Sequence, residues 1–231
     1  KDRINIKGLD KVGLLIPNLN LAMRADGYPN VSIRGIGAFG LTQGVGFYLD
    51  DVQLFSDASS RFGDLDRIEV LKGPQGILYG GSNIGGAVKF VSKRPSSEEG
   101  LTGKVKYQTG EQGIGDTEVS ANIPLQNDWA MRIFAFSRDD DGFIKNPNSD
   151  GIDNQPTNVG AYSQDGARIS IAGSLTDNLS LYASYRRNEY LGPVNAWARE
   201  LGQPGSFQYP KILDTGRNSP THAQTTSATL E

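Results

Sequence analysis

Residues 64–95 read DLDRIEVLKGPQGILYGGSNIGGAVKFVSKRP, in which two strand-like runs flank a segment rich in glycine. The first run, Arg67 to Leu71, ends at Lys72-Gly73-Pro74, where Pro removes a backbone donor and Gly permits a positive φ. Between Gly76 and Gly86, five of eleven residues are glycine, and a second run follows from Ala87 to Lys93. The stretch therefore predicts a tight loop that links two strands.

The same stretch, from Arg67 to Pro95, resembles the closing segment of the plug domain of TonB-dependent outer-membrane receptors. Its departures from the family's usual residues are Lys72 for Arg, Asn83 for Ala, Val88-Lys89 for Ile-Asn and Ser92 for Thr. Two earlier blocks, Val31 to Gly37 and Tyr48 to Val52, resemble further plug segments, with Asp51 in place of the usual Gly. Three blocks in the family's order make the resemblance specific over residues 9–98.

This resemblance implies a mixed α+β plug domain over residues 1–97, followed over residues 98–231 by antiparallel strands of a transmembrane β-barrel. Lys1 opens in what reads as folded sequence, without the features of a signal peptide. We therefore expect a truncated N-terminus, with a TonB box and a first plug strand upstream. About six barrel strands are too few to close a membrane barrel, so we expect further strands as well.

Composition excludes several other classes. No apolar run approaches the ~20 residues that a membrane-spanning helix needs. The chain has no Cys and one His, which excludes cysteine zinc sites, thiol nucleophiles and disulfides. A net charge of -3 carries no electrostatic footprint for nucleic acid. We expect no enzyme activity, no cofactor and no metal site.

After Gly100 the sequence alternates apolar and polar residues with a period of two, which is typical of strands. The alternating runs are 101–109, 119–125, 129–138, 167–174, 179–186 and 221–230. Short polar turns at Gln126 to Asp128 and Thr176 to Asn178 contrast with long connections at 139–162 and 192–220. Short turns at one end and long loops at the other are typical of an outer-membrane barrel.

The alternation also predicts which side chains face lipid and which face the lumen. The apolar faces should meet lipid, and Trp129, beside a short turn, should lie in the periplasmic aromatic girdle. Its alternative interpretation is a core residue at the end of a sheet. The side chains expected to point inward, toward plug carboxylates or water, are Lys104, Lys106, Arg132, Arg168 and Arg186.

Elements before the glycine-rich stretch are less regular. We expect a short helix or turn at the start of Leu9 to Leu21, stopped by Pro17, and strands at Val31 to Gly35 and Phe47 to Leu54. Residues 35–40, GIGAFG, satisfy the dinucleotide fingerprint, but a strand-like sequence rather than a helix follows. We interpret the segment as a loop.

The resemblance and the loop positions together give candidate site residues. We expect the ligand to contact the plug residues Arg34, Phe39, Gln43, Phe55 and Phe62. A second group, expected to lock the plug to the barrel, comprises Arg67, Glu69, Lys72 and Arg94. Residues 146–151 imitate the start of a calcium loop, but Thr157 stands where a bidentate Glu is required.

By resemblance, the function is TonB-dependent transport of a large scarce nutrient across the bacterial outer membrane, with an iron-siderophore complex as the leading candidate. The implied partners are TonB with its inner-membrane energising complex, outer-membrane lipid, and a small-molecule ligand such as a metal chelate. The alternative is a soluble β-rich ligand-binding or adhesin-like module, for which the same alternation would serve. A nucleotide-dependent enzyme, resting on the loop at Gly35, is a third hypothesis.

Overall fold

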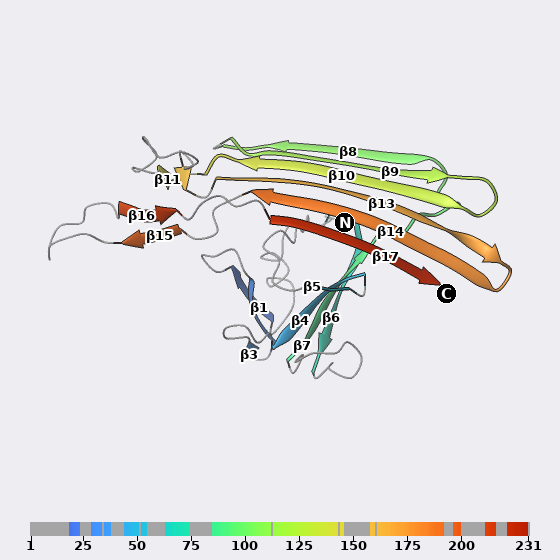
Figure 1. Cartoon of the computed structure of the whole chain (residues 1–231), viewed down its shortest axis with the longest axis horizontal. Coiled ribbons are helices and arrows are strands. Elements are labelled where there is room, and N and C mark those ends of the chain that lie inside the picture. Colours follow the sequence, from blue (N-terminus) through green and yellow to red (C-terminus); the bar gives the residue numbers. More distant parts are fainter. Residues whose placement is uncertain are drawn as a thin grey trace, which may run out of the picture. The chain divides into compact units, whose positions relative to one another are not determined.

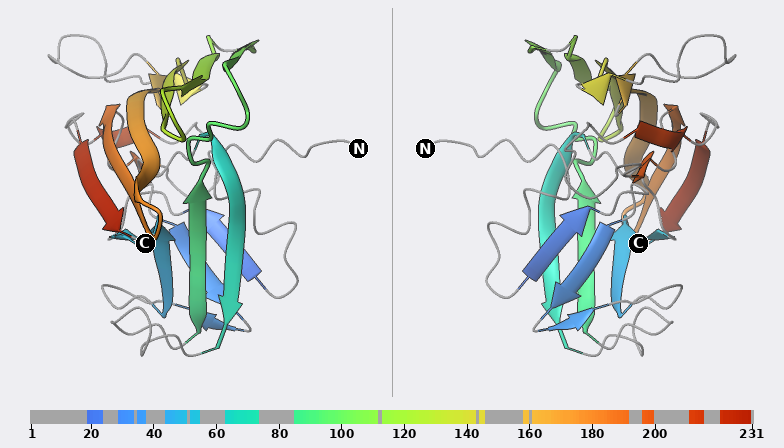
Figure 2. Two further views of the ribbon diagram at one scale, coloured as in Figure 1. Left: turned by 90° about the vertical axis from the view of Figure 1, so that its right-hand side faces the viewer. Right: turned by 90° about the vertical axis from the view of Figure 1, so that its left-hand side faces the viewer.

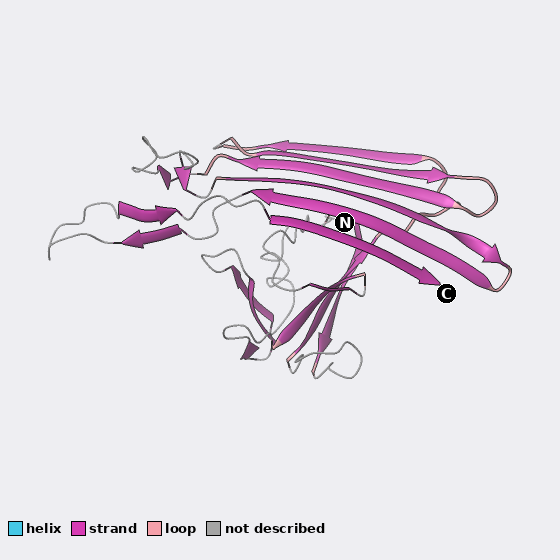
Figure 3. Cartoon of the chain, in the orientation of Figure 1, coloured by secondary structure: helices cyan, strands magenta, loops and turns pink. Residues whose placement is uncertain are grey.

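The structure is a computed structural model that describes residues 19–23, 29–33, 35–37, 44–50, 52–54, 63–73, 85–111, 113–142, 144–145, 158–159, 161–191, 196–199, 211–215 and 221–230. The described residues form strands and turns, with no helix among them (Figure 3). The chain divides into two compact units, Lys1–Arg94 and Pro95–Glu231. The expected domain boundary after residue 97 stays a prediction.

The first unit holds two sheets. The smaller has the order β1-β2-β3, with strands β1 (Leu19–Met23), β2 (Pro29–Ile33) and β3 (Ile36–Gly37). The larger has the order β5-β4-β7-β6, with strands β4 (Val45–Leu49), β5 (Val52–Leu54), β6 (Leu65–Lys72) and β7 (Gly86–Ser92). Figure 2 shows β6 and β7 running side by side, antiparallel to each other.

The glycine-rich stretch forms the pair of strands that the sequence predicts. β6 and β7 pair antiparallel up to Lys72 and Gly86, and the Gly73 N–H donates to the Gly85 carbonyl at 3.2 Å. Gly73 has a φ of 101°, which explains why the strand stops at a glycine. β7 lies between β6 and the parallel strand β4, and its side chains Val88 and Phe90 are buried.

One expectation for the first unit needs correction, and a second lies mostly outside the described residues. Phe47 to Leu54 is not one strand, because the chain reverses at Asp50 and β4 pairs with β5 as a hairpin. Asp50 has a φ of 47°, a left-handed conformation that Asp tolerates better than most residues. Of the segment expected to begin with a short helix or turn, Leu19 to Leu21 belong to β1, and residues 9–18 lie outside the described ranges.

The dinucleotide interpretation also fails where the structure describes it. Gly35 occupies a turn with a φ of 79°, and Ile36 pairs back onto Ile33 of β2. The fingerprint requires the glycines to open a helix whose N-terminus holds a pyrophosphate. Here the residues directly after Gly35 form strand β3 instead.

The second unit is a six-stranded antiparallel sheet in which neighbours along the chain are also neighbours in space (Figure 1). Its six strands confirm the six alternating runs. They are β8 (Thr102–Thr109), β9 (Gly115–Pro124), β10 (Ala130–Asp140), β13 (Tyr162–Thr176), β14 (Leu179–Leu191) and β17 (Thr221–Leu230).

The connections of this sheet follow the predicted lengths. The turn between β9 and β10 closes with the Leu125 N–H donating to the Trp129 carbonyl at 2.8 Å. The long connections contain two small hairpins that the sequence did not predict. These are β11 (Ile144–Lys145) with β12 (Asn158–Val159), and β15 (Ala196–Arg199) with β16 (Lys211–Thr215).

Candidate functional site

The six-stranded sheet has one polar face, which carries the cations predicted to point inward. A single row across the sheet joins Lys104, Ser120, Phe134, Arg168 and Arg186, each opposite the next on the neighbouring strand. Adjacent rows on the same face carry Lys106 and Arg132. The prediction that these five cations share one face is confirmed.

Two of these cations, Arg132 and Arg168, are buried, and Lys106 is half-buried. Arg168 is 2% exposed, and its guanidinium carbon lies 5.8 Å from the centre of the Phe134 ring. Lys106 Nζ lies 3.8 Å from Glu118 Oε2 on the neighbouring strand, and the Ser170 hydroxyl donates to the Arg132 carbonyl at 3.4 Å. A buried cation is costly without a favourable contact, and the Phe134 ring provides one for the Arg168 guanidinium.

Two aromatic side chains on the polar face were not assigned from the sequence. Phe134 and Phe136 are both buried, with ring centres 5.8 Å apart. Phe136 lies over Gly166, the residue opposite it on β13, where an added Cβ would come within 2.4 Å of the ring. The glycine therefore provides the space for the ring, a relation that alternation alone does not reveal.

The opposite face of the sheet is apolar and exposed. Val105 is 73% exposed and Ile169 is 51% exposed, although both are large and apolar. Further large apolar side chains exposed in this unit are Leu101, Tyr107, Val119, Leu125, Leu175, Leu179 and Tyr185. Apolar residues gathered in this way on one face of a sheet are typical of a surface that contacts lipid or another apolar partner.

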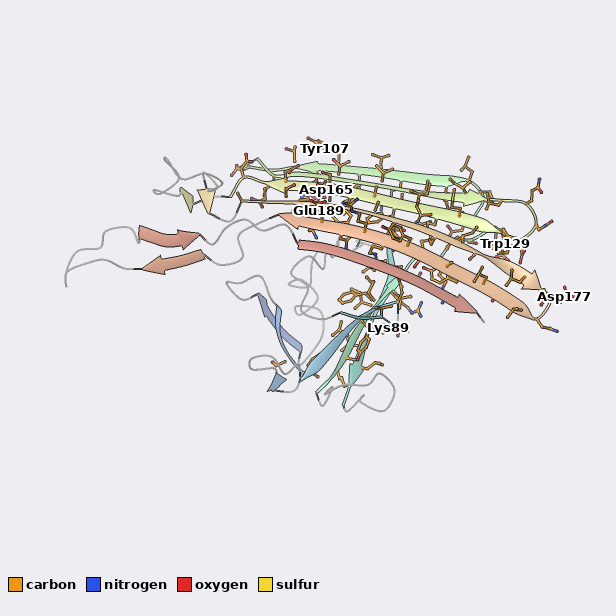
Figure 4. All side chains as sticks on the ribbon, viewed as in Figure 1. Lys89, Tyr107, Trp129, Asp165, Asp177 and Glu189 are labelled. Carbon is orange, nitrogen blue, oxygen red and sulfur yellow. The ribbon has the colours of Figure 1, made fainter. Side chains whose placement is uncertain are left out.

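The two ends of the apolar face differ in chemistry. Tyr107 lies opposite Thr117, and the same cross-strand row continues through Ser137 to Asp165 and Glu189. In Figure 4 Trp129 and Asp177 lie toward the short-turn end of the sheet, away from Asp165 and Glu189. The apolar band is thus bordered by a polar row at one end and by Trp129 at the other.

The short-turn end is held by two contacts from consecutive residues. Trp129 lies against Gly173, where an added Cβ would be 2.3 Å from the indole. Asp128 accepts a hydrogen bond from the Ser174 backbone N–H at 3.0 Å, and hydrogen bonding from Ser174 lowers the pKa of this carboxyl. The turn between β9 and β10 is therefore fastened to β13. Whether Trp129 contributes to a membrane girdle stays a prediction.

In the first unit, Asp50 connects the β4–β5 turn to the end of β7. Its backbone N–H donates to the Phe90 carbonyl at 3.0 Å, and its carboxylate accepts from the Ser92 N–H at 2.7 Å. This gives a structural role to the aspartate of the Tyr48 to Val52 block. The sequence indicated that Tyr48 to Val52 is a plug segment, but it did not predict the hydrogen bond from Asp50 to Ser92.

Of the residues predicted to lock the plug to the barrel, Arg67, Glu69 and Lys72 belong to β6, and Arg94 follows β7. Arg67 Nε donates to Glu69 Oε1 at 2.7 Å and its Nη1 donates to Asp66 Oδ2 at 2.8 Å, so its described partners belong to its own strand. The hydrogen bonds that Arg67 donates to Glu69 and, second, to Asp66 raise the pKa of Arg67. Lys72 and Arg94 are exposed. Their role between the units stays a prediction.

The five predicted ligand-binding residues, Arg34, Phe39, Gln43, Phe55 and Phe62, lie outside the residues whose side chains the structure describes. The calcium-like segment at 146–151 lies outside them as well. His222 is in β17, opposite Glu189. Within the described ranges, no helix is long and apolar enough to span a membrane.

The sequence also gave no sign of Asn122, which is 0% exposed on the polar face of β9. Its Oδ1 accepts from the Ser96 N–H at 3.0 Å, and its Nδ2 donates to the carbonyls of Ser96 and Gly100, at 2.8 Å each. It therefore holds the backbone of the segment that enters the second unit.

The first part of the chain matches a known domain. Residues 2–87 match the TonB-dependent Receptor Plug Domain. The ferrichrome outer membrane transporter and phage receptor of Escherichia coli is 31% identical over 117 residues, which cover 48% of this chain and 15% of that protein. The vitamin B12 transporter BtuB of Vibrio vulnificus is 27% identical over 180 residues, which cover 75% of this chain and 28% of that protein.

Solved structures agree in fold. The ferric yersiniabactin uptake receptor FyuA of Yersinia pestis superposes with a TM-score of 0.71 at 19% identity, covering 84% of this chain and 31% of that one. The ferripyoverdine receptor of the Pseudomonas aeruginosa outer membrane gives 0.66 at 18% identity, covering 97% and 29%. The chain thus spans under a third of these proteins. Its residues 2–87 match the plug domain of TonB-dependent receptors, and the fold of the chain resembles part of the solved receptors named above.

Proposed function

We propose that the protein containing this chain imports a metal chelate, with a ferric siderophore as the leading candidate, across the bacterial outer membrane with energy delivered by TonB. The observation that carries the proposal is the plug sequence followed by a sheet with one polar and one exposed apolar face. A sheet of this kind in a barrel wall would meet lipid with the apolar face and line the lumen with the polar one.

The choice of ligand rests on the relatives. The ferrichrome transporter and the ferrioxamine receptor of Yersinia enterocolitica are each 31% identical to this chain over the matched residues. Relatives named for vitamin B12, and a structure named for copper with a TM-score of 0.59, widen the range of candidates. The cations Lys104, Arg132, Arg168 and Arg186 on the polar face suit an anionic chelate.

The soluble ligand-binding or adhesin-like module is the less favoured alternative. A sheet in a soluble sandwich buries its apolar face against a second sheet. Here Val105 and Ile169 stay 73% and 51% exposed, and an exposed apolar band of this kind would promote aggregation in water. The alternative would regain support if the intact protein were extracted from cells in soluble form without detergent.

The test is uptake by cells that carry the full-length gene, in paired strains with and without TonB. Cells should be supplied in turn with labelled ferrichrome, ferrioxamine, vitamin B12 and a copper salt. The proposal expects uptake of a ferric chelate that is lost without TonB. TonB-dependent uptake of vitamin B12 or copper alone would overturn the ligand, and uptake that does not depend on TonB would overturn the mechanism.

A further inference from the structure

Residues 93–100, which we call the junction, join β7 of the first unit to β8 of the second. At its far end, Asn122 makes the hydrogen bonds described above to the backbone of Ser96 and Gly100. Both amide protons of Asn122 point at carbonyl oxygens and its oxygen accepts an N–H. Only an amide offers two donors and an acceptor in this geometry, so the pattern is specific for Asn over Asp or Leu.

At its near end, the junction is held by the first unit. The Ser92 N–H donates to the Asp50 carboxylate at 2.7 Å, and the Lys93 N–H donates to the Asp64 carbonyl at 2.9 Å. The backbone is therefore fastened at Lys93 on one side and at Ser96 on the other. Only Arg94 and Pro95 separate the two fastenings.

The residues between the fastenings restrict the chain further. Pro95 has a φ fixed near -65° by its ring, and it biases Arg94 away from the helical region toward extended conformations. The torsions that remain adjustable are few. Pro95 is also buried, unlike Arg94.

We propose that Asn122 is a positioning residue that anchors the junction to the barrel wall, and that it limits changes of direction between β7 and β8 to the backbone torsions of residues 93–95. Burial makes the anchor strong, because loss of the Asn122 amide would leave one N–H and two carbonyl groups without this partner. The proposal concerns the junction itself, so it does not depend on which ligand the protein imports or on whether TonB acts on it.

The first test is amide hydrogen exchange in the full-length protein in detergent. In Asn122→Leu, which keeps the approximate volume, the Ser96 amide should exchange about tenfold faster or more, since it loses its acceptor. The matched control is Ser120→Ala, two residues away on the same strand and face, which should leave Ser96 unchanged. Unchanged Ser96 exchange in Asn122→Leu, or an equal increase in Ser120→Ala, would overturn the proposal.

A second readout follows the mobility of the junction. This chain has no Cys, so a Cys introduced at Ser97 can carry a spin label once any Cys elsewhere in the full-length protein has been replaced by Ser. The spectrum should sharpen in Asn122→Leu and stay broad in Ser120→Ala, while amides of β10 keep their protection. If Asn122→Leu fails to assemble, Asn122→Ser decides by the same two measurements. A broad spectrum in a folded variant would contradict the anchor even if transport were lost.

Discussion

The carboxylate of Asp50 accepts a hydrogen bond from the backbone N–H of Ser92 at 2.7 Å, across 42 positions of the chain. Asp50 also adopts a φ of 47° to close the β4–β5 turn. We expect Asp50→Ala to destabilise the plug sheet by roughly 2–4 kcal/mol, because it removes a charge-assisted bond and places Ala in a left-handed conformation. Amide exchange of β7 measures the effect. Asp50→Asn, which keeps an acceptor and tolerates this φ, should cost less than half as much.

Replacing Gly86 or Gly73 by Ala would strain the backbone at both positions, but only at Gly86 would the new Cβ also overlap a neighbouring atom. At Gly86, with a φ of 142°, an added Cβ would lie 2.2 Å from the Leu71 carbonyl oxygen, whereas at Gly73, with a φ of 101°, nothing lies within 4 Å. Gly86→Ala should therefore destabilise the plug by about 2–5 kcal/mol, from strain and overlap together. Gly73→Ala should cost only about 1–2 kcal/mol, from strain. Equal losses in urea unfolding would show that the overlap is relieved.

Gly173 provides the space that the Trp129 indole occupies. Gly173→Ala should displace the ring and destabilise the barrel wall by about 1–3 kcal/mol, the usual range for overpacking. The change should also shift the tryptophan fluorescence. In a Trp129→Ala background the same substitution should be close to neutral, because the obstacle is gone. If Gly173→Ala destabilised the Trp129→Ala protein as strongly, the loss of stability would not come from overlap with the indole.

The bond between Asp128 and Ser174 predicts a pH response at the short-turn end. Because hydrogen bonding lowers the pKa of Asp128 in the folded state, the bond stabilises the turn above the unfolded pKa, and this contribution is lost as pH falls through the folded pKa. The amide shift of Ser174, followed by NMR against pH, should titrate below the ordinary aspartate range. In Asp128→Asn the acid transition should disappear. If the acid transition of the Ser174 amide persisted in Asp128→Asn, another carboxyl group would be its cause.

A substitution at the exposed Ile169 tests whether the apolar face of the sheet contacts lipid. If this face meets lipid, Ile169→Arg should reduce barrel stability by roughly 2–4 kcal/mol near the midplane. An exposed position in a water-soluble protein would tolerate Arg with little change. Folding of the full-length protein into lipid vesicles measures the difference. Ser137→Arg, in the polar row of the same face, is the matched control and should be milder.

Much of the fold can be predicted from local sequence. Alternation with a period of two is a property of each strand by itself, so the six strands of the sheet and the shared face of Lys104, Arg132 and Arg168 followed from it. Glycine and proline likewise marked where β6 ends. The turn at Asp50 was missed because Asp51 replaces the glycine that would have signalled a hairpin.

What the sequence by itself determined is therefore the strands, their faces and the family to which the plug segment belongs. Only the tertiary structure decided which side chain reaches which distant backbone: Asp50 to Ser92, Phe136 over Gly166, and Asn122 to Ser96 and Gly100. These contacts depend on register, which places residues far apart in the chain at neighbouring positions on adjacent strands. An isolated Asn in an alternating strand gives no sign that it will hold the junction.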